Sequence, residues 1–480
     1  MAGETMLQFV GTGQAYPTKR APGLRAEDFL EIASRYAAPD GEEQAGRCSQ
    51  CGVPYCAVHC PLHNHIPDWL RLTAEGRLRE AYELSNSTST MPEICGRICP
   101  QDRLCEGNCV IEFSGHGAVT IGAVEKFITD TAWDNGWVEP LVPGPARGQS
   151  VGIIGSGPAG LSTAEYLRAL GYDVTIYDRH DRAGGLLTYG IPGFKLEKPV
   201  VMRRIDRLAA AGILFQQNFE VGRDASLDDL RARHDAVLIA TGVYKAREIK
   251  APGVGSDGIV EALDYLIASN RKGFGDDVPA FDSGALNAAG KHVVVIGGGD
   301  TAMDCVRTAV RQGAASVKCL YRRDRANMPG SQREVANAEE EGVEFVWLAA
   351  PQGFDAGDSV NAVRTSRMRL GAPDSSGRRS PEPEPGSDLT LPAALVIKAL
   401  GFDAEPLPVL FGALDLGVTR WGTIRTDSKT MMTNLDGVFA AGDIVRGASL
   451  VVWAIRDARD VSERMHAWLK AKAAAQRQAA

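Results

Sequence analysis

Eight of the ten cysteines lie in two short runs. The runs are Cys48-x2-Cys51-x4-Cys56-x3-Cys60-Pro61 and Cys95-x3-Cys99-Pro100-x4-Cys105-x3-Cys109. Such spacings let several thiolates converge on one small centre, and crowded cysteines in a reducing compartment indicate metal rather than disulfides. Eight thiolates suit two four-ligand centres. Two iron–sulfur clusters are the favoured interpretation, because zinc pairs usually show repeated C-x2-C knuckles and only one is present here. Structural zinc and disulfides are the alternatives.

A glycine-rich turn follows the apolar run 151–154 and precedes an apolar helical stretch. Its residues are Gly155, Ser156, Gly157, Pro158, Ala159 and Gly160, which fit the pattern G-x-G-x-x-G. The first glycine permits a tight turn, the second lets a pyrophosphate approach the backbone, and the third packs the helix against the strand. A second apolar run ends at Asp178, where an acid can hold a ribose hydroxyl. The stretch therefore predicts a dinucleotide site with its phosphates at a helix N-terminus.

The same pattern returns after the apolar run 292–296. Its residues are Gly297, Gly298, Gly299, Asp300, Thr301 and Ala302, the accepted G-x-G-x-x-A variant. Aligning the following strands puts Tyr321 where the first unit has its acid, followed by Arg322 and Arg323. Two guanidiniums in place of a carboxylate favour the 2′-phosphate of NADP over NAD. The alternative is a solvated arginine pair, one of which Asp324 could neutralise.

The elements that must position these residues require more than one core. A chain of 480 residues predicts roughly three domains. The net charge of −8 and the lack of a basic stripe argue against a nucleic-acid partner. No apolar run approaches the roughly 18 residues of a membrane helix, and no signal peptide is evident at the start. We therefore expect a cytoplasmic protein.

Four further segments give expectations about local structure. Apolar residues at helical spacing predict a helix over 27–36. Residues 139–149 are rich in proline and glycine and predict a linker. Residues 371–390 are polar and proline-rich and predict a mobile hairpin tip or loop. A helix with a buried face is expected from about Ser449, with a frayed tail after Lys470.

Two dinucleotide loops about 140 residues apart resemble the two-domain flavoprotein reductases of the glutathione-reductase type. In that family the first loop binds FAD and the second binds NAD(P)H. The residues that resemble its other FAD-binding motifs are Gly185, Leu186, Thr241, Gly242, Gly442 and Asp443. No cysteine pair lies in the flavin unit, so a disulfide reductase is not expected.

The resemblance implies an α/β fold in which a mostly helical iron–sulfur domain precedes two Rossmann-like domains. The expected boundaries are 1–145 for the cluster domain, 146–280 and 400–480 for the two parts of the FAD domain, and 281–399 for the NADPH domain.

A narrower resemblance covers about 25–470. The stretches 47–56, 60–67 and 190–196, the GGGDTAMD motif and the Arg322-Arg323-Asp324 triplet are similar to the small subunits of NADPH-dependent glutamate synthase. The same module resembles the N-terminal part of dihydropyrimidine dehydrogenase.

This resemblance also implies a partition of the cluster ligands. Cys48, Cys51, Cys56 and Cys109 would hold one 4Fe–4S cluster. Cys60, Cys99 and Cys105 would hold three irons of the second. Glu125 stands where the dehydrogenase relative uses a side-chain oxygen as the last ligand, and it is favoured over Cys95, although thiolate is the usual ligand chemically.

The activity implied is electron input. NADPH would reduce FAD, and the clusters would carry electrons to a large FMN- and iron–sulfur-containing subunit that makes glutamate from glutamine and 2-oxoglutarate. Hydride transfer needs no protein acid or base, so no catalytic residue is assigned. The alternatives are a reductase subunit for another acceptor (a pyrimidine, a ferredoxin, or sulfide or polysulfide), a stand-alone diaphorase, and a regulatory subunit without turnover.

Overall fold

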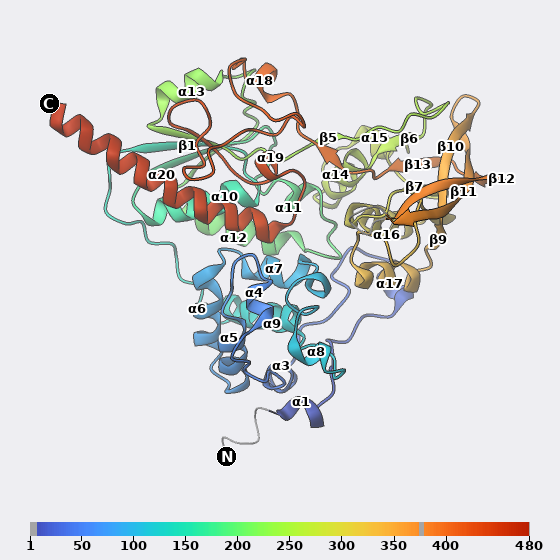
Figure 1. Cartoon of the computed structure of the whole chain (residues 1–480), viewed down its shortest axis with the longest axis horizontal. Coiled ribbons are helices and arrows are strands. Elements are labelled where there is room, and N and C mark those ends of the chain that lie inside the picture. Colours follow the sequence, from blue (N-terminus) through green and yellow to red (C-terminus); the bar gives the residue numbers. More distant parts are fainter. Residues whose placement is uncertain (1–6, 374–378, 480) are drawn as a thin grey trace.

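The chain forms a helical unit and two sheet units in this computed structural model (Figure 1). The structure describes residues 7–373 and 379–479. The helical unit is drawn in blue below the two sheets. Hydrogen bonds join it to both of them, between Glu93 and Arg204 and between Arg103 and Pro329. Within the described residues, no helix combines the length and the apolar character needed to cross a bilayer.

The helical unit is built from short helices around one apolar core that includes Trp69, Val124 and Ile128. Its helices are α1 Gln8–Gly11, α2 Pro22–Arg25, α3 Ala38–Gly46, α4 Tyr55–Val58, α5 Ile66–Ala74, α6 Leu78–Thr88, α7 Pro92–Ile98, η2 Gln101–Arg103, α8 Val110–Phe113 and α9 Ile121–Asp134. Prolines start α5 and α7 in their first turns, where a missing N–H costs nothing. The brevity of these helices leaves most of the clustered cysteines at helix ends and in turns, whereas Cys95 lies within α7.

The first sheet unit has five parallel strands in the order β15-β4-β1-β2-β3. The strands are β1 Ser150–Ile154, β2 Asp173–Tyr177, β3 Leu214–Gln216, β4 Ala236–Ile239 and β15 Val438–Ala440. The helices are α10 Pro158–Ala169, α11 Leu186–Tyr189, α12 Lys198–Ala210, α13 Leu227–Arg233, α18 Leu407–Leu410, α19 Asp443–Arg446 and α20 Val451–Ala479. β1 and β4 are continuous apolar runs because parallel strands are covered on both faces. β15 returns from the end of the chain, so the second unit is inserted into the first.

The second sheet unit repeats this plan in the order β6-β13-β7-β8-β9. Its strands are β6 Ile259–Glu261, β7 His292–Ile296, β8 Ser316–Tyr321, β9 Glu344–Trp347 and β13 Leu395–Lys398, and its helices are α14 Ala262–Gly273, α15 Pro279–Asp282, α16 Asp300–Arg311 and α17 Gln332–Glu340. An antiparallel sheet of β10 Ala349–Ala356, β11 Val360–Pro373 and β12 Arg379–Pro392 projects from it (Figure 1). β5 Lys245–Ala246 pairs with β14 Phe402–Asp403 where the chain crosses between the sheets.

One expected domain boundary is misplaced. Residues 259–261 were assigned to the first part of the FAD domain, which was expected to end at 280. They form β6, which pairs in parallel with β13 of the second sheet. The crossing therefore lies near β5, at 245–246. A three-residue edge strand has no periodicity that a sequence pattern could detect, and only its pairing identifies it.

The structure bears on three further local expectations. The segment 27–36 is not helical, because Phe29 packs on Phe194 of the first sheet unit while Tyr36 lies in the core of the helical unit. Residues 371–373 and 379–390 belong to the antiparallel strands β11 and β12, so the expected hairpin is present with longer strands than expected, and residues 374–378 lie outside the described residues. The tail after Lys470 continues helix α20 to Ala479.

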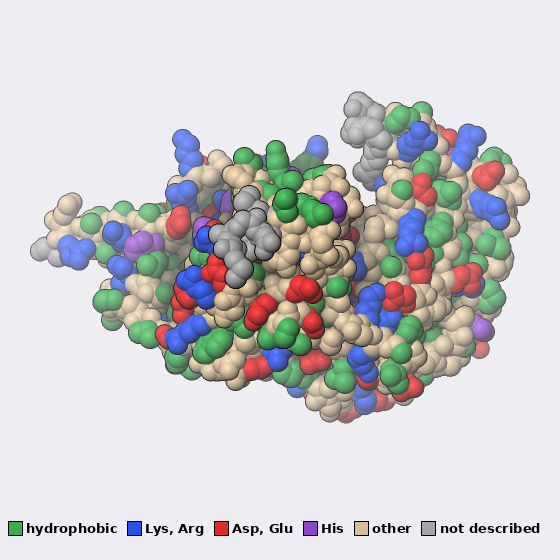
Figure 2. Space-filling model, turned by 90° about the horizontal axis from the view of Figure 1, so that it is seen from below, with side chains coloured by type: hydrophobic (Ala, Val, Ile, Leu, Met, Phe, Trp, Pro, Cys, Tyr) green, Lys and Arg blue, Asp and Glu red, His purple; other side chains and the backbone are tan. Residues whose placement is uncertain are grey.

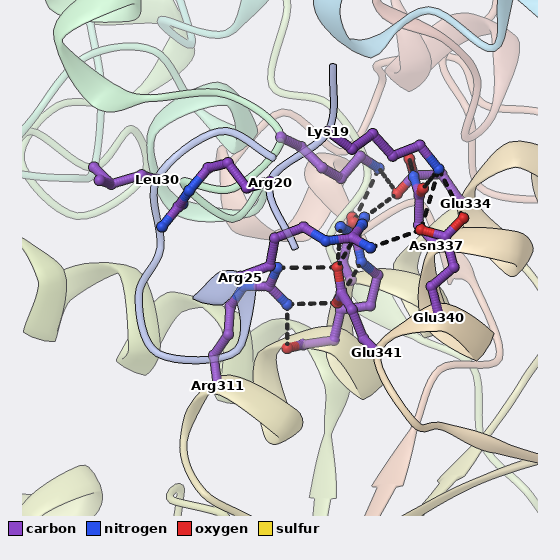
Figure 3. A network of polar contacts seen from close by, with 12 residues as sticks. Lys19, Arg20, Arg25, Leu30, Arg311, Glu334, Asn337, Glu340 and Glu341 are labelled. Atoms are coloured by element: carbon purple, nitrogen blue, oxygen red, sulfur yellow. Dashed lines mark hydrogen bonds and ion pairs between the residues drawn. The ribbon is translucent and has the colours of Figure 1, made fainter. Parts of the chain in front are cut away.

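Residues 12–34 form a strap that leaves the helical unit and reaches α17 of the second sheet unit (Figure 3). Lys19 donates to Glu340 Oε1 at 2.9 Å. Arg25 is almost fully buried, donates to Glu340 Oε2 at 2.6 Å and lies 3.5 Å from Glu341. Breaking a buried ion pair is costly because it leaves a charge without its partner. The strap therefore fixes the second sheet unit to the helical unit.

Replacing Arg25 by alanine should release the strap while the second sheet unit stays folded, because Glu341 keeps Arg307 and Arg311. Hydrogen bonds to charged groups contribute about 1.5–3 kcal/mol, so local opening should rise roughly tenfold or more. Trypsin should then cut faster at Lys19 and Arg20. Arg79→Ala removes two exposed ion pairs away from the strap, with Glu83 and Glu139, and is the matched control. Equal cleavage of Arg25→Ala and the unmodified chain would contradict the anchoring role.

Candidate functional site

The first glycine turn links β1 to α10 and leaves a cradle for a ligand. Gly155 has φ +105°, and a Cβ there would lie 2.5 Å from the carbonyl oxygen of Ala240. A Cβ at Gly160 would lie 2.0 Å from the carbonyl oxygen of Gly155, so this position packs the helix on the strand. A Cβ at Gly157 would meet nothing within 4 Å. The middle glycine therefore faces open space at a helix N-terminus, which fits a pyrophosphate.

Asp178 follows β2 and orders this turn. Its Oδ2 accepts from the backbone N–H of Ser156 at 2.7 Å and from the Ser156 hydroxyl at 2.5 Å, and its Oδ1 accepts from the N–H of His180 at 2.9 Å. Asp178 lines two adjoining cavities that also share Gly155 and Thr241. Two cavities meeting at the glycine turn suit an elongated dinucleotide such as FAD.

The larger of these cavities lies where all three units meet. Its lining includes residues of the first turn, the α11 loop, the second turn, the α19 and α20 region and the helical unit: Gly157, Pro158, Ala159, Gly185, Leu186, Thr241, Gly242, Asp300, Thr301, Asp443, Cys99 and Gln101. Gly442 does not line this cavity, but a Cβ there would lie 2.9 Å from the Cβ of Ala159. A ligand in this cavity would thus contact both dinucleotide-binding units and a cysteine-bearing loop.

The second glycine turn links β7 to α16 and has the same design. A Cβ at Gly297 would lie 2.2 Å from the carbonyl oxygen of Ala399, whereas one at Gly299 would meet nothing within 4 Å. A Cβ at Gly298 would strike the ring of Tyr321, so the residue that replaces the ribose acid packs directly on the turn. Asp300 begins α16, and its Oδ1 accepts from the N–H of Ser331 at 3.0 Å.

Arg322 and Arg323 follow β8 beside this turn. Arg322 is exposed and Arg323 is half-buried. Asp324 Oδ1 accepts from the backbone and side chain of Asn327, at 2.9 and 2.7 Å. Neither arginine pairs with a carboxylate within the described part of the chain, and Arg323 Nε is buried without a partner there. Both guanidiniums are thus available to a phosphate.

The clustered cysteines line two separate small cavities. Cys48, Cys51, Cys56 and Cys109 line the first. Cys60, Cys95, Cys99, Cys105 and Glu125 line the second. Pro100 contributes to this placement, because the residue before a proline is pushed out of helical geometry, and Cys99 is extended just after α7.

Each cavity offers at least four candidate ligands, as many as a four-iron cluster needs. Across residues 7–373 and 379–479, no three His, Cys, Asp or Glu side chains come close enough to hold one metal ion. We propose that the first cavity holds an outer cluster, on Cys48, Cys51, Cys56 and Cys109. The second would hold an inner cluster, on Cys60, Cys99, Cys105 and a fourth group.

Glu125 and Cys95 both line the inner cavity. Glu125 Oε1 accepts from Asn64 Nδ2 at 3.2 Å and from the Ser85 hydroxyl at 3.4 Å. Burial raises the pKa of Glu125 to about 8, although both hydrogen bonds favour its ionised form. Cys95 lies within α7 and contacts Ser89 at 3.9 Å. The two polar donors orient the carboxylate, which supports Glu125 as the proposed fourth ligand.

Sequence analysis missed several residues of this site. Lys195 Nζ lies 2.9 Å from Asp304 Oδ1 and 3.7 Å from Glu334 Oε2 inside the large cavity. Burial opposes the charge of Lys195, but the two carboxylates outweigh it and hold its pKa above the usual range. Burial raises the pKa of Asp304 to about 6, and Lys195 limits that rise. Lys195 belongs to the stretch 190–196, whose resemblance to the small subunits could have identified it as a site residue. Asp304 and Glu334 are ordinary helix residues in the sequence, and only the fold brings them here.

Comparison with known proteins agrees with this architecture. The family model for dihydropyrimidine dehydrogenase domain II, 4Fe-4S cluster, matches residues 25–137. The model for pyridine nucleotide-disulphide oxidoreductase matches residues 149–458. The solved Mycobacterium tuberculosis FprA in complex with NADPH has the same fold over 68% of this chain and 86% of its own, with a TM-score of 0.58 and 21% identity. Fold and site thus define an iron–sulfur flavoprotein oxidoreductase that uses NADPH.

Two relatives narrow the class to a family. The glutamate synthase (NADPH) small chain of Azospirillum brasilense is 66% identical over 99% of this chain and 98% of its own length. The putative oxidoreductase AegA of Escherichia coli is 45% identical over 95% of this chain but only 70% of its own. The chain belongs to the family of the glutamate synthase (NADPH) small chains. Its cofactors are FAD, NADPH and two 4Fe–4S clusters.

Arg322→Ala combined with Arg323→Ala should weaken NADPH binding far more than NADH binding. Each charge-assisted hydrogen bond to a 2′-phosphate contributes about 1.5–3 kcal/mol, or roughly ten- to a hundredfold in affinity. Arg325→Ala is the matched control, since Arg325 follows on the same loop but pairs with Glu339. The dissociation constants of both coenzymes measure the effect. An equal loss of affinity for NADPH and NADH would contradict the proposed role of Arg322 and Arg323 in binding the 2′-phosphate.

Glu125→Ala should lose or convert one of the two clusters, whereas Cys95→Ser should keep both. The carboxylate already lies in the inner cavity between two hydrogen-bond donors, while Cys95 lies within a helix. Iron content and the electron paramagnetic resonance spectrum of anaerobically purified protein report the outcome, with about eight irons per chain expected when both clusters are present. The reverse pattern would transfer the ligand role to Cys95.

Proposed function

We propose that this chain is the electron-input subunit of a glutamate synthase, oxidising NADPH and delivering electrons to a larger partner chain. The observation that carries the proposal is the sharing of Cys99 and Gln101 by two cavities. One is the central cavity, which is lined by residues of both dinucleotide turns, and the other is the inner-cluster cavity. This sharing supports an arrangement of coenzyme, flavin and inner cluster in series.

The chain's residues contribute binding and position. The two glycine turns bind the phosphates of the two dinucleotides, and Arg322 and Arg323 select the coenzyme that carries a 2′-phosphate. Lys195 and Asp304 come from different sheet units and meet in the central cavity, so they help to close the units around it. Bound FAD supplies the chemistry, because it takes up two electrons from NADPH and can release them singly to clusters. No side chain needs to move a proton to the reacting atoms.

The proposed partner is a large subunit that carries FMN and an iron–sulfur centre. The surface beside the outer cluster supports docking there, because large apolar side chains stay exposed on it. These are Val53 (61% exposed), Tyr55 (48%), Val58 (52%) and Phe113 (73%). Figure 2 views the molecule from the side of the helical unit, and apolar patches there lie among acidic and basic side chains. An apolar surface rimmed by polar groups is typical of a protein interface.

The proposed location is the cytoplasm, where thiols stay reduced.

A second candidate is a reductase subunit or module that serves another acceptor. AegA contains a region similar to nearly all of this chain but is longer than it, so the same module occurs in a protein with additional sequence. A stand-alone diaphorase is a further possibility that the assay below separates. The high identity over whole lengths with the Azospirillum small chain favours the glutamate synthase role.

The isolated chain should reduce artificial dyes with NADPH but form no glutamate from glutamine and 2-oxoglutarate. Adding the large subunit should restore glutamate formation, because electrons leaving the clusters then meet a flavin that reduces the substrate. The measurement compares dye reduction and glutamate formation for the chain alone and for the reconstituted complex. Glutamate made by the chain alone would reveal an unrecognised catalytic site. Dye reduction without glutamate in the verified complex would favour a different acceptor.

A further inference from the structure

The loop between Cys99 and Cys105 is held by the second sheet unit as well as by its own. Ser331 donates its hydroxyl to Asp102 Oδ1 at 3.0 Å, and the N–H of Gln332 donates to Asp102 Oδ2 at 3.2 Å. Arg103 donates to the carbonyl oxygen of Pro329. Residues 329–333 lead into the first turn of α17 and contact three successive positions, 101–103, of the inner-cluster loop. This contact joins segments more than 220 residues apart in the sequence.

Arg333 brings a full positive charge to this contact and faces a carboxylate of the cluster loop. It donates to Glu106 Oε2 at 2.6 Å, to Gln101 Oε1 at 3.3 Å and to the Tyr16 hydroxyl at 3.0 Å. Its guanidinium also lies 4.7 Å from the centre of the Tyr16 ring. Arg333 lines the large central cavity together with Cys99. The side chain therefore stands between the flavin cavity and the inner-cluster loop.

Glu106 is a buried carboxylate directly after Cys105. Only 2% of its surface is exposed. Besides Arg333, it accepts from the Tyr16 hydroxyl at 2.7 Å and from the N–H of Gly122, in the first turn of α9, at 2.9 Å. Charges act over long range in a low-dielectric interior, so this carboxylate and its counter-ion bear on an electron acceptor beside Cys105.

The same segment also contacts the coenzyme turn. The N–H of Gly330 donates to the carbonyl oxygen of Gly298 at 3.0 Å. The N–H of Ser331 donates to Asp300 Oδ1 at 3.0 Å. The position of residues 330–333 is therefore fixed by the NADPH-binding turn on one side and by the cluster loop on the other.

From these contacts we infer that Arg333 is a positioning residue for the inner cluster, supplied by the coenzyme-binding unit. It neutralises Glu106 and fixes the loop of Cys99 and Cys105, and thereby sets how readily the inner cluster accepts an electron. The inference rests on the proposed inner-cluster ligands. The unit that binds NADPH thus also completes the surroundings of the carrier that takes electrons from the flavin.

The test is a charge cycle on the holoenzyme, with the midpoint potentials of both clusters followed by electron paramagnetic resonance at about pH 8, far above the usual carboxylate range. Arg333→Gln should lower the inner-cluster potential, because an unpaired carboxylate disfavours an added electron. Glu106→Gln should raise it, because an unpaired guanidinium favours the electron. The double variant should return close to the original value. Arg333→Lys keeps the charge and should shift the potential less than Arg333→Gln.

Two controls keep the outcome interpretable. Arg364→Gln removes the same charge from the same unit, but its partner is the half-exposed Asp355 on the projecting antiparallel sheet, so the inner-cluster potential should stay unchanged. The outer cavity is lined only by residues 48–121, so the outer cluster is an internal control in every variant. Iron content is measured first. The inference is overturned if the variants keep both clusters and their inner-cluster potential equals that of the unmodified protein. It is also overturned if Arg333→Gln and Glu106→Gln shift this potential in the same direction. If Cys60→Ser and Cys99→Ser both leave the inner signal intact, the ligand assignment itself fails.

Discussion

A buried ion-pair network holds the three units together, and the central cavity depends on it. Arg307 of α16 binds Glu341 through two hydrogen bonds, at 3.0 and 2.9 Å, and Glu334 at 2.7 Å. Arg311 binds Glu341 at 2.6 Å, and the centre of the Phe194 ring lies 4.0 Å from its guanidinium. Buried charges are tolerated only when each finds partners, so these groups accept few alternative arrangements. The network thereby fixes the second sheet unit against the first.

The network continues into the cavity and onto the strap. Glu334 also faces Lys195, which brings the charges of the network to the place where the two dinucleotide units meet. On the other side, Arg25 of the strap joins Glu340 and Glu341 (Figure 3). The helical unit is thus attached to the second sheet unit at both ends of α17, through the strap and through the inner-cluster loop. This attachment suits a protein that passes electrons between carriers. The rate of electron transfer depends on the distance between two carriers, and the attachment keeps that distance constant.

The helical unit is joined to the first sheet unit in a different way. Met91, Ile94 and Cys95 belong to the same apolar core as β1, α10 and α20. Beside this core, Arg204 of α12 binds Glu93 of α7 at 2.8 and 2.9 Å, with both side chains buried. Apolar burial contributes more to the stability of this interface but is not directional. The ion pair between Arg204 and Glu93 fixes the position of α12 relative to α7. The inner-cluster loop is therefore anchored to the flavin unit by packing and to the coenzyme unit by charge.

The sequence by itself determined the features that depend on local chemistry. Glycine spacing identified both dinucleotide turns, since only residues without a side chain fit where a Cβ would strike Ala240 or Ala399. Tyr321 in place of an acid, followed by Arg322 and Arg323, indicated the coenzyme. Short cysteine spacings indicated the metal centres. The tertiary structure alone decided that β6 belongs to the second sheet, that 27–36 is not helical, and that Arg333 lies beside Glu106. Those outcomes depend on contacts between residues far apart in the chain, and such contacts leave no periodicity or motif in either partner alone.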